Sequence, residues 1–194
     1  MQLVKIIPIL LSLFGCTSFT LCAAESGLID GNSGSMLVHG MLTENACRLE
    51  MNSEWQDVDL GIIETRMLQF PGDRAHVVDV GMRFKDCVRV ESRKQNPLTQ
   101  TLVWSAYQPA VAATILAPAD LDNPDLVQVI GTKGLALRII DDTGRTILPG
   151  VTQGPQLLSP GQDALSFHIV PERTNAALDA GYFYARLDVR LSYD

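Results

Sequence analysis

An alternation of apolar and polar residues closes this chain, from Gly181 to Asp194. Every second position is small or apolar, and from Arg186 onward the positions between them are polar. A period of two predicts a β-strand with one buried face. That face carries Gly181, Phe183, Ala185, Leu187, Val189, Leu191 and Tyr193. Because no residue follows Asp194 to form a neighbouring strand, we expect an open apolar sheet edge that another segment must cover.

The N-terminal residues predict a secretory signal over residues 1–24. Lys5 supplies the positive charge, residues 6–14 form an apolar run, and small residues precede the expected cleavage after Ala24. The run is too short to span a membrane. An alternative remains open, in which Cys16 is lipidated as in a lipoprotein signal. The mature chain, residues 25–194, has the length of one domain.

Charge and cysteine content narrow the possible functions. The formal net charge of −7 argues against nucleic acid as a partner and against adsorption to an anionic membrane. After removal of the signal, Cys47 and Cys87 are the remaining cysteines. In an exported chain we expect them to form a disulfide, which contributes about 4 kcal/mol in the chain-entropy model. A zinc site is disfavoured, since no pair of histidines accompanies them.

Short apolar or alternating runs, separated by Gly, Pro, Asn and Asp, indicate an all-β protein. A single β-sandwich of about seven strands fits the length. We expect a hairpin turn at residues 141–144 and a long loop, with room for a helical turn, at residues 108–125. The expected strands are Met36–Leu42, Cys47–Met51, Val77–Phe84, Thr101–Ala106, Leu126–Val129, Leu135–Ile140, Ala164–Val170 and Tyr182–Ser192.

Several short motifs, taken in order, resemble the subunits of chaperone–usher fimbriae, the pilin family of Gram-negative bacteria. The resemblance covers residues 36–194. It is carried by Met36-x-Val38-x-Gly40-x-Leu42, Val58-Asp59-Leu60-Gly61, Arg83-Phe84-Lys85-Asp86-Cys87, the segment Gly134 to Asp141, and a closing segment with the penultimate Tyr193.

The resemblance implies an incomplete immunoglobulin-like β-sandwich that a donated strand completes. A periplasmic chaperone would lend a strand in transit, and the N-terminal extension of a neighbouring subunit would replace it in the fibre, which is β-augmentation. Here the extension would be residues 25–46 and the pilin domain residues 47–194. The donor strand would be Met36, Val38, Gly40 and Leu42. The groove and chaperone-binding residues would be Phe183, Ala185, Leu187, Val189, Leu191, Tyr193 and Asp194. Basic residues of the chaperone would bind the terminal carboxylate of Asp194.

A narrower role follows from the stretch between Cys47 and Gly61, which holds Trp55-Gln56. It is similar to the minor subunits that end a fibre at its base and anchor it at the outer membrane. The alternative is an ordinary shaft or adaptor pilin that still accepts a further subunit. Either role implies export through the periplasm to a fimbrium at the outer membrane. The expected partners are a periplasmic chaperone, the outer-membrane usher and neighbouring pilin subunits.

Enzymatic interpretations are weaker, and we expect no catalytic residue, cofactor or metal. The Asp142-Thr143-Gly144 string is found in aspartic proteases, but those need two carboxylates that share a proton, and one copy is better explained as a turn. His39, His76 and His168 have no triad or metal spacing with Ser166 or Asp79. A secreted hydrolase remains the alternative from another class.

The tryptophans and one acidic cluster also have structural explanations. Trp55 and Trp104 could stack on a sugar, but we expect Trp55 to pack near the strand that holds Cys47. The acidic residues lack the spacing of a calcium loop, and we expect a solvated face made of Glu50, Glu54, Asp57 and Asp59.

Overall fold

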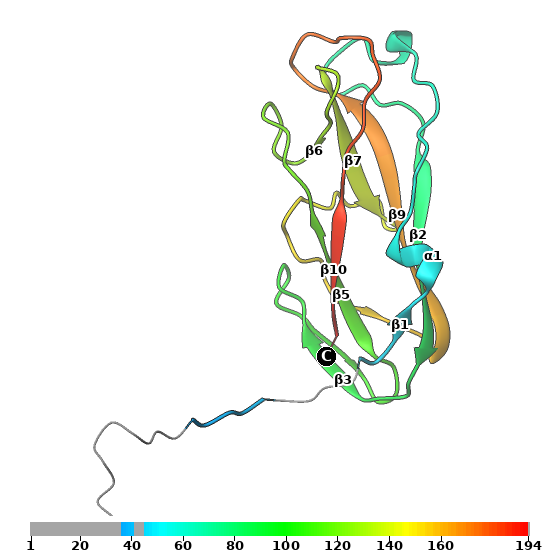
Figure 1. Ribbon diagram of the computed structural model, residues 1–194, viewed down its shortest axis with the longest axis vertical. Coiled ribbons are helices and arrows are strands. Elements are labelled where there is room, and N and C mark those ends of the chain that lie inside the picture. The colour runs from blue at the N-terminus through cyan, green and yellow to red at the C-terminus, as the bar shows by residue number, and fades with distance from the viewer. Residues whose placement is uncertain (1–35, 41–44, 194) are drawn as a thin grey trace, which may run out of the picture. The chain divides into compact units, whose positions relative to one another are not determined.

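The computed structural model describes residues 36–40 and 45–193. The chain divides into two units, Met1–Leu42 and Thr43–Asp194, and every helix and strand described lies in the second, which we call the body (Figure 1). The expected signal at residues 1–24, the alternative lipidation at Cys16, and the residues Leu42 and Asp194 lie outside the described residues.

The body is almost entirely β-structure, which confirms the all-β prediction. One short α-helix, one turn of 3-10 helix and a set of strands make up its described elements. Their bounds are β1 (Arg48–Leu49), α1 (Met51–Glu54), η1 (Thr65–Met67), β2 (Val78–Cys87), β3 (Ser92–Gln95), β4 (Leu102–Ser105), β5 (Ala110–Leu116), β6 (Val127–Gln128), β7 (Leu135–Asp141), β8 (Gln156–Leu157), β9 (Gly161–Arg173) and β10 (Asp188–Tyr193).

The larger sheet has the strand order β1-β2-β9-β7-β6, with every neighbouring pair antiparallel. Side chains of β2 alternate between the core and solvent: Met82 and Phe84 are buried, while Gly81 and Arg83 are exposed. The register of β2 against β9 shifts between Phe84 and Cys87. A shift of this kind bends the strand at its end, beside the place where β1 pairs.

The second sheet has the order β10-β5-β8, and β3 pairs with β4 in a hairpin of its own. Here the prediction of a long loop over residues 108–125 is wrong for residues 110–116, because they form β5, the central strand of this sheet, while no strand or helix is formed over residues 117–125. The sequence Ala-Val-Ala-Ala-Thr-Ile-Leu of β5 is buried or half-buried throughout. A strand between two neighbours that is covered on both faces shows no alternation, and alanine has low β-propensity, so the usual sequence signals were absent.

The strand predictions within the body hold with shifted ends. The expected strand Tyr182–Ser192 is in β-structure from Asp188 onward, apart from one bridge between Tyr184 and Ile130. Met51 begins α1 rather than ending a strand, and residues 36–40 are in no strand. The predicted turn at 141–144 is confirmed by a hydrogen bond from Gly144 N to Asp141 O at 2.8 Å.

The core lies between the two sheets and includes Phe84, Leu126 and Ile139, all buried. The disulfide between Cys47 and Cys87 is confirmed, and both cysteines belong to this core. It ties the start of the body, just before β1, to the end of β2. Two antiparallel sheets packed around one core and joined in this way form an immunoglobulin-like sandwich.

One ionic network lies within the larger sheet. Glu172 of β9 is only 4% exposed. It accepts hydrogen bonds from Arg138 Nη2 at 2.7 Å and from Arg74 Nε at 2.8 Å. Burial raises the pKa of the Glu172 carboxyl, but the hydrogen bonds from Arg138 and Arg74 outweigh it, so the pKa lies below its ordinary value. The carboxylate therefore stays ionised and paired.

No helix among the described residues is long and apolar enough to cross a membrane.

Candidate functional site

The sandwich is open along one side, between β10 and β1. On one edge β10 pairs with β5, and on its other edge no described strand pairs with it. β1 is likewise the end strand of the larger sheet. In Figure 1 the red strand β10 runs along the front of the body, with β1 and α1 beside it. The edge of β10 is therefore free to hydrogen-bond with another strand.

One wall of this opening is β10 and the residues before it. Along residues 183–193 the side chains alternate between half-buried and exposed without interruption. The half-buried set packs against the core: Phe183, Ala185, Leu187, Val189, Leu191 and Tyr193. The structure thus brings onto one face all the predicted groove residues that it describes. These side chains contact the core on one side and are left partly uncovered on the other.

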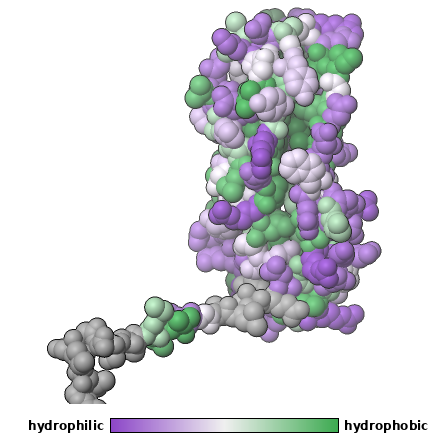
Figure 2. Space-filling view, viewed as in Figure 1, coloured by the Kyte–Doolittle hydropathy of each residue, from purple (hydrophilic) through white to green (hydrophobic). Residues whose placement is uncertain are grey.

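The opposite wall comes from the irregular segment that follows Cys47. Leu49, Val58, Leu60 and Ile63 are also partly buried against the core. Sequence reasoning missed this wall as a binding surface, although the alternation of Val58 and Leu60 was a usable signal. Figure 2 shows hydrophobic side chains along the middle of this side of the body, flanked by hydrophilic ones. We call the space between the two walls the groove.

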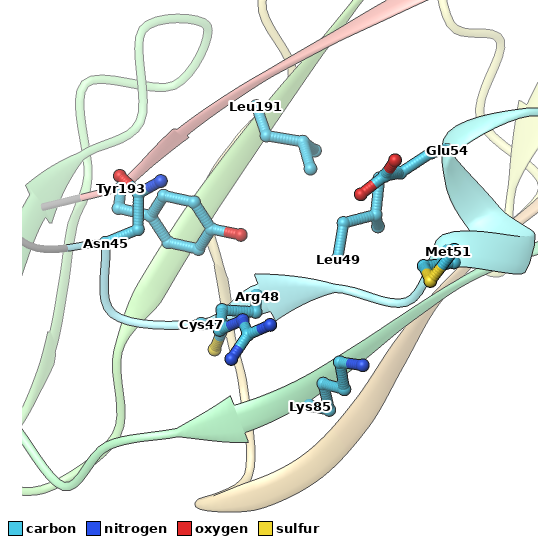
Figure 3. Close-up of a pocket in the computed structure, with 9 residues that line it drawn as sticks. All are labelled: Asn45, Cys47, Arg48, Leu49, Met51, Glu54, Lys85, Leu191 and Tyr193. Carbon is cyan, nitrogen blue, oxygen red and sulfur yellow. The ribbon is translucent and has the colours of Figure 1, made fainter.

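At the β1 end the groove opens into a cavity of about 440 Å³. Its residues are Asn45, Cys47, Arg48, Leu49, Met51, Glu54, Lys85, Leu191 and Tyr193. In Figure 3 Leu191 and Tyr193 extend from β10 toward Leu49 and Glu54 across the gap. Burial raises the pKa of the Tyr193 phenol, so the hydroxyl remains neutral at physiological pH. The cavity has an apolar centre and a charged rim, which suits an aliphatic side chain entering from solvent.

The end of β10 is held in place by a residue of the β3–β4 hairpin. Lys94 Nζ donates a hydrogen bond to the Tyr193 carbonyl oxygen at 2.9 Å. This contact fixes the last described residue of the strand beside the cavity.

The predicted donor residues that the structure describes are solvent-exposed. Met36 is 88% exposed and Val38 is similarly uncovered. An added Cβ at Gly40 would meet no heavy atom within 4 Å. Leu37 between them is exposed as well, and apolar side chains without cover are costly in water.

The residues of the enzymatic alternative have structural roles. Asp141 accepts hydrogen bonds from the backbone and hydroxyl of Thr143 and from Arg145. Burial raises the pKa of the Asp141 carboxyl, but these bonds together bring it below the ordinary value. Asp141 is therefore an ionised turn residue rather than a proton-sharing acid.

The histidines also make local contacts. A nitrogen of His168 lies 2.6 Å from Asp79 Oδ1, and Nε2 of His76 lies 2.7 Å from the carbonyl oxygen of Leu60. The His76 contact supports the irregular groove wall. Within residues 36–40 and 45–193 no group of three or more His, Cys, Asp or Glu side chains could hold a metal ion.

The prediction that Trp55 packs near the Cys47 strand is wrong, since Trp55 is 79% exposed. Helix α1 turns Ser53 inward instead, and the Ser53 hydroxyl accepts a hydrogen bond from the backbone N–H of Arg83 at 2.9 Å. Trp55, at the end of the helix, then points to solvent. Of the acidic cluster, Glu54, Asp57 and Asp59 are exposed and Glu50 is half-buried.

Comparison with known proteins identifies the family. The sequence model described as "Fimbrial protein" matches residues 36–194. The chain belongs to the fimbrial protein family. Members of this family are structural subunits of fimbriae, and the matched region spans both the exposed residues 36–40 and the body with its open groove.

Two curated relatives represent different kinds of subunit. The chain is 26% identical to the probable major fimbrial subunit LpfA of Escherichia coli O157:H7 over 188 residues, which cover 95% of this chain and 94% of the relative. It is also 26% identical to the PAP fimbrial minor pilin protein of Escherichia coli over 164 residues, which cover 83% of this chain and 77% of the relative. Similarity at this level does not separate the two kinds.

Solved structures confirm the fold. The body resembles the P pilus rod subunit PapA with a TM-score of 0.62 at 18% sequence identity, over 77% of this chain and all of PapA. It resembles a structure of a chaperone–usher pilus equally, with a TM-score of 0.62 at 17% identity, over 84% of this chain and 97% of the other. The incomplete immunoglobulin-like sandwich is therefore the fold of pilins.

Proposed function

We propose that this chain is a structural subunit of a fimbria that receives a donated strand in its groove and donates residues 36–42 to a neighbour. The observation that carries the proposal is the unpaired edge of β10, which faces β1 across two rows of half-buried apolar side chains. No catalytic step is involved. Assembly is driven by burial of these surfaces and by backbone hydrogen bonds along β10.

The apolar side chains of the donor segment supply much of the binding free energy. Burial of Met36, Val38 and Leu42 would contribute roughly 5–9 kcal/mol before ordering costs are subtracted. Gly40 leaves room for the donor backbone to approach the groove closely.

We expect the donated strand to run antiparallel to β10. Every strand pair described in this body is antiparallel, and antiparallel pairing is slightly more stable per residue. In this orientation Met36 would lie near Tyr193, where a long flexible side chain can fill the cavity. Leu42 would then lie near Leu187, a half-buried residue of the same wall.

The same groove explains the partners that we propose. A periplasmic chaperone would cover the groove before assembly, because an open apolar edge favours aggregation. The usher at the outer membrane would then exchange that cover for the extension of the next subunit. We place the terminal carboxylate of Asp194 at the chaperone contact, and the assembled subunit in a fimbrium on the surface of a Gram-negative bacterium.

A second candidate role is the subunit that ends the fibre at its base and anchors it. Similarity to the PAP fimbrial minor pilin protein supports it, as does the stretch around Trp55-Gln56. The two roles differ in whether another subunit can enter the groove after the chaperone leaves.

A strand-exchange assay separates these roles. The mature chain, purified with its chaperone, is mixed with a synthetic peptide of its own residues 25–46 and with the corresponding peptides of sister subunits. We expect at least one peptide to displace the chaperone and remain bound. If none of the peptides displaces the chaperone from this chain, while a sister subunit exchanges its chaperone normally, the terminating role is favoured.

A further inference from the structure

We infer that neighbouring copies of this chain also meet body to body, with the acidic loop at residues 117–126 of one copy facing the basic region around Arg89 of the copy that donates the strand. This inference rests on the proposed function, because it needs one copy to occupy the groove of another. The contact would add specificity and speed to strand donation, and its occupant is a second copy of this chain.

The length of chain between donor and body limits where the second body can lie. The donor segment ends at Leu42, and Ala46 and Cys47 are already buried in the body. The connection from residue 42 to residue 47 spans at most about 17 Å when fully extended. A copy that donates its strand must therefore place its Cys47 end beside the end of the groove it has entered.

The antiparallel orientation selects which end that is. With Leu42 near Leu187, the donating body lies toward the end of the acceptor formed by residues 117–126 and 174–184, which we call the apex. Asp122 Oδ2 joins these two segments, because it accepts hydrogen bonds from Thr174 Oγ1 at 3.1 Å and from the backbone N–H of Ala176 at 2.9 Å. Figure 1 shows this end of the body opposite to β1 and β3.

The two ends carry complementary charges. Residues 117–126 hold Asp120, Asp122 and Asp125 and no lysine or arginine. The first two carboxylates shape the loop by accepting hydrogen bonds from residues 122, 123, 174 and 176. Asp125 is exposed, and its negative charge also acts on Arg138 of β7 and helps to raise the pKa of that guanidinium.

At the other end, residues 83–94 hold five lysines or arginines and only Asp86 and Glu91 as acids. The exposed Arg89 lies between Cys87 and β3, close in sequence to the disulfide that begins the body. The acidic apex of the acceptor and the basic region around Arg89 of the donating copy attract each other as the two bodies approach.

An exposed aromatic patch adjoins the acidic loop. Ile130 pairs directly with Tyr184, so their side chains lie on the same side of the bridge, and Tyr182 lies two residues earlier in the chain. Tyr182 is 84% exposed, and the other two are about half exposed. Tyrosine is enriched where proteins meet, and this patch would supply short-range contact once the charges have aligned the bodies.

The test compares two donors on one acceptor. The acceptor is the chaperone-bound mature chain, wild type or Asp125→Arg. The donors are the labelled peptide of residues 25–46 and the labelled full mature chain, the latter with its own groove covered by the chaperone. Incorporation of label is followed at low salt and at about 1 M salt, where the Debye length falls to about 3 Å. The matched control is Asp142→Arg, which makes the same charge change in the turn after β7.

At low salt we expect Asp125→Arg to slow incorporation of the full chain by about tenfold, with little effect at high salt, and to leave the peptide unaffected. A donor chain with Arg89→Glu should recover most of the lost rate. Equal rates for the Asp125→Arg and Asp142→Arg acceptors, or no recovery with Arg89→Glu, would overturn the body-to-body contact while leaving strand donation intact. A peptide that enters no groove would instead contradict the proposed function, and the inference would fall with it.

Discussion

Gly40 illustrates how a single residue can matter only in a complex. In the described chain nothing lies within 4 Å of where its Cβ would be, so the free extension does not require glycine there. The requirement arises when the donor backbone is pressed against the groove of a neighbour, because a side chain at this point of the alternating pattern would face the acceptor.

We therefore expect Gly40→Leu to block entry of the extension into a neighbouring groove while leaving capture by the chaperone unchanged. The matched control is His39→Leu, which adds the same side chain on the opposite side of the strand. Incorporation of each variant into fibres, measured by immunoblot of sheared surface material, gives the comparison. Normal incorporation of Gly40→Leu would show that the donor segment lies elsewhere.

The buried Glu172 carboxylate makes a second prediction. Its pKa is lowered in the folded chain, so its stabilising contribution is complete above the unfolded value of about 4.3 and is lost as the pH falls through the lowered folded value. Glu172→Gln leaves the Arg138 guanidinium buried without its counter-ion and should cost about 3–5 kcal/mol at neutral pH.

Denaturant unfolding of the strand-complemented chain between pH 7 and pH 2 measures this effect. The difference between wild type and Glu172→Gln should shrink at the acid end of that range. Glu64→Gln, at an exposed glutamate, is the control and should change the free energy of unfolding little. A constant difference at every pH would contradict the assigned pKa direction.

At the scale of elements, prediction from sequence succeeded where one face of a strand is buried. The alternation that ends in Tyr193 identified β10 and its groove face. The same reasoning failed for β5, which is covered on both sides and rich in alanine, so no period was visible. The second groove wall was missed because residues 50–63 contain little regular structure, and the exposure of Trp55 depends on how α1 turns, which no local pattern encodes.

The groove face of β10 should be sensitive to charge, and its outer face should not. Leu191→Asp places a carboxylate beside the cavity, where a donated side chain can no longer be buried favourably, and the lost apolar burial alone is worth about 1.5–3 kcal/mol. The neighbouring Ser192→Asp adds the same charge to the exposed face. Recovery of the chaperone-bound chain from the periplasm should fall sharply for the first variant and little for the second; equal recovery would place the binding surface on another face.

The disulfide acts on an element rather than on one residue, because it holds the segment leading into β1 to the end of β2. Its removal in Cys47→Ser should cost about 4 kcal/mol and loosen the groove wall that follows. Periplasmic accumulation of this variant should be reduced, as should that of the double variant Cys47→Ser with Cys87→Ser. Unchanged levels would show that the bridge is dispensable for the groove.

At the scale of the whole molecule, the body is a sandwich that lacks cover along one side. The core continues into two rows of half-buried apolar side chains, and no described segment of the chain closes them. Folding stability is a small difference between large terms. A missing strand is therefore enough to leave the isolated body marginal, and strand donation becomes part of folding.

The most direct measurement is the thermal unfolding of the mature chain, refolded without helper proteins, with and without the peptide of residues 25–46. We predict a poorly stable or aggregating chain whose melting temperature rises as peptide is added. When the peptide is at 100 times its dissociation constant, the free energy of unfolding should increase by about 2.7 kcal/mol. A stable, soluble monomer whose melting temperature does not respond to the peptide would contradict the account.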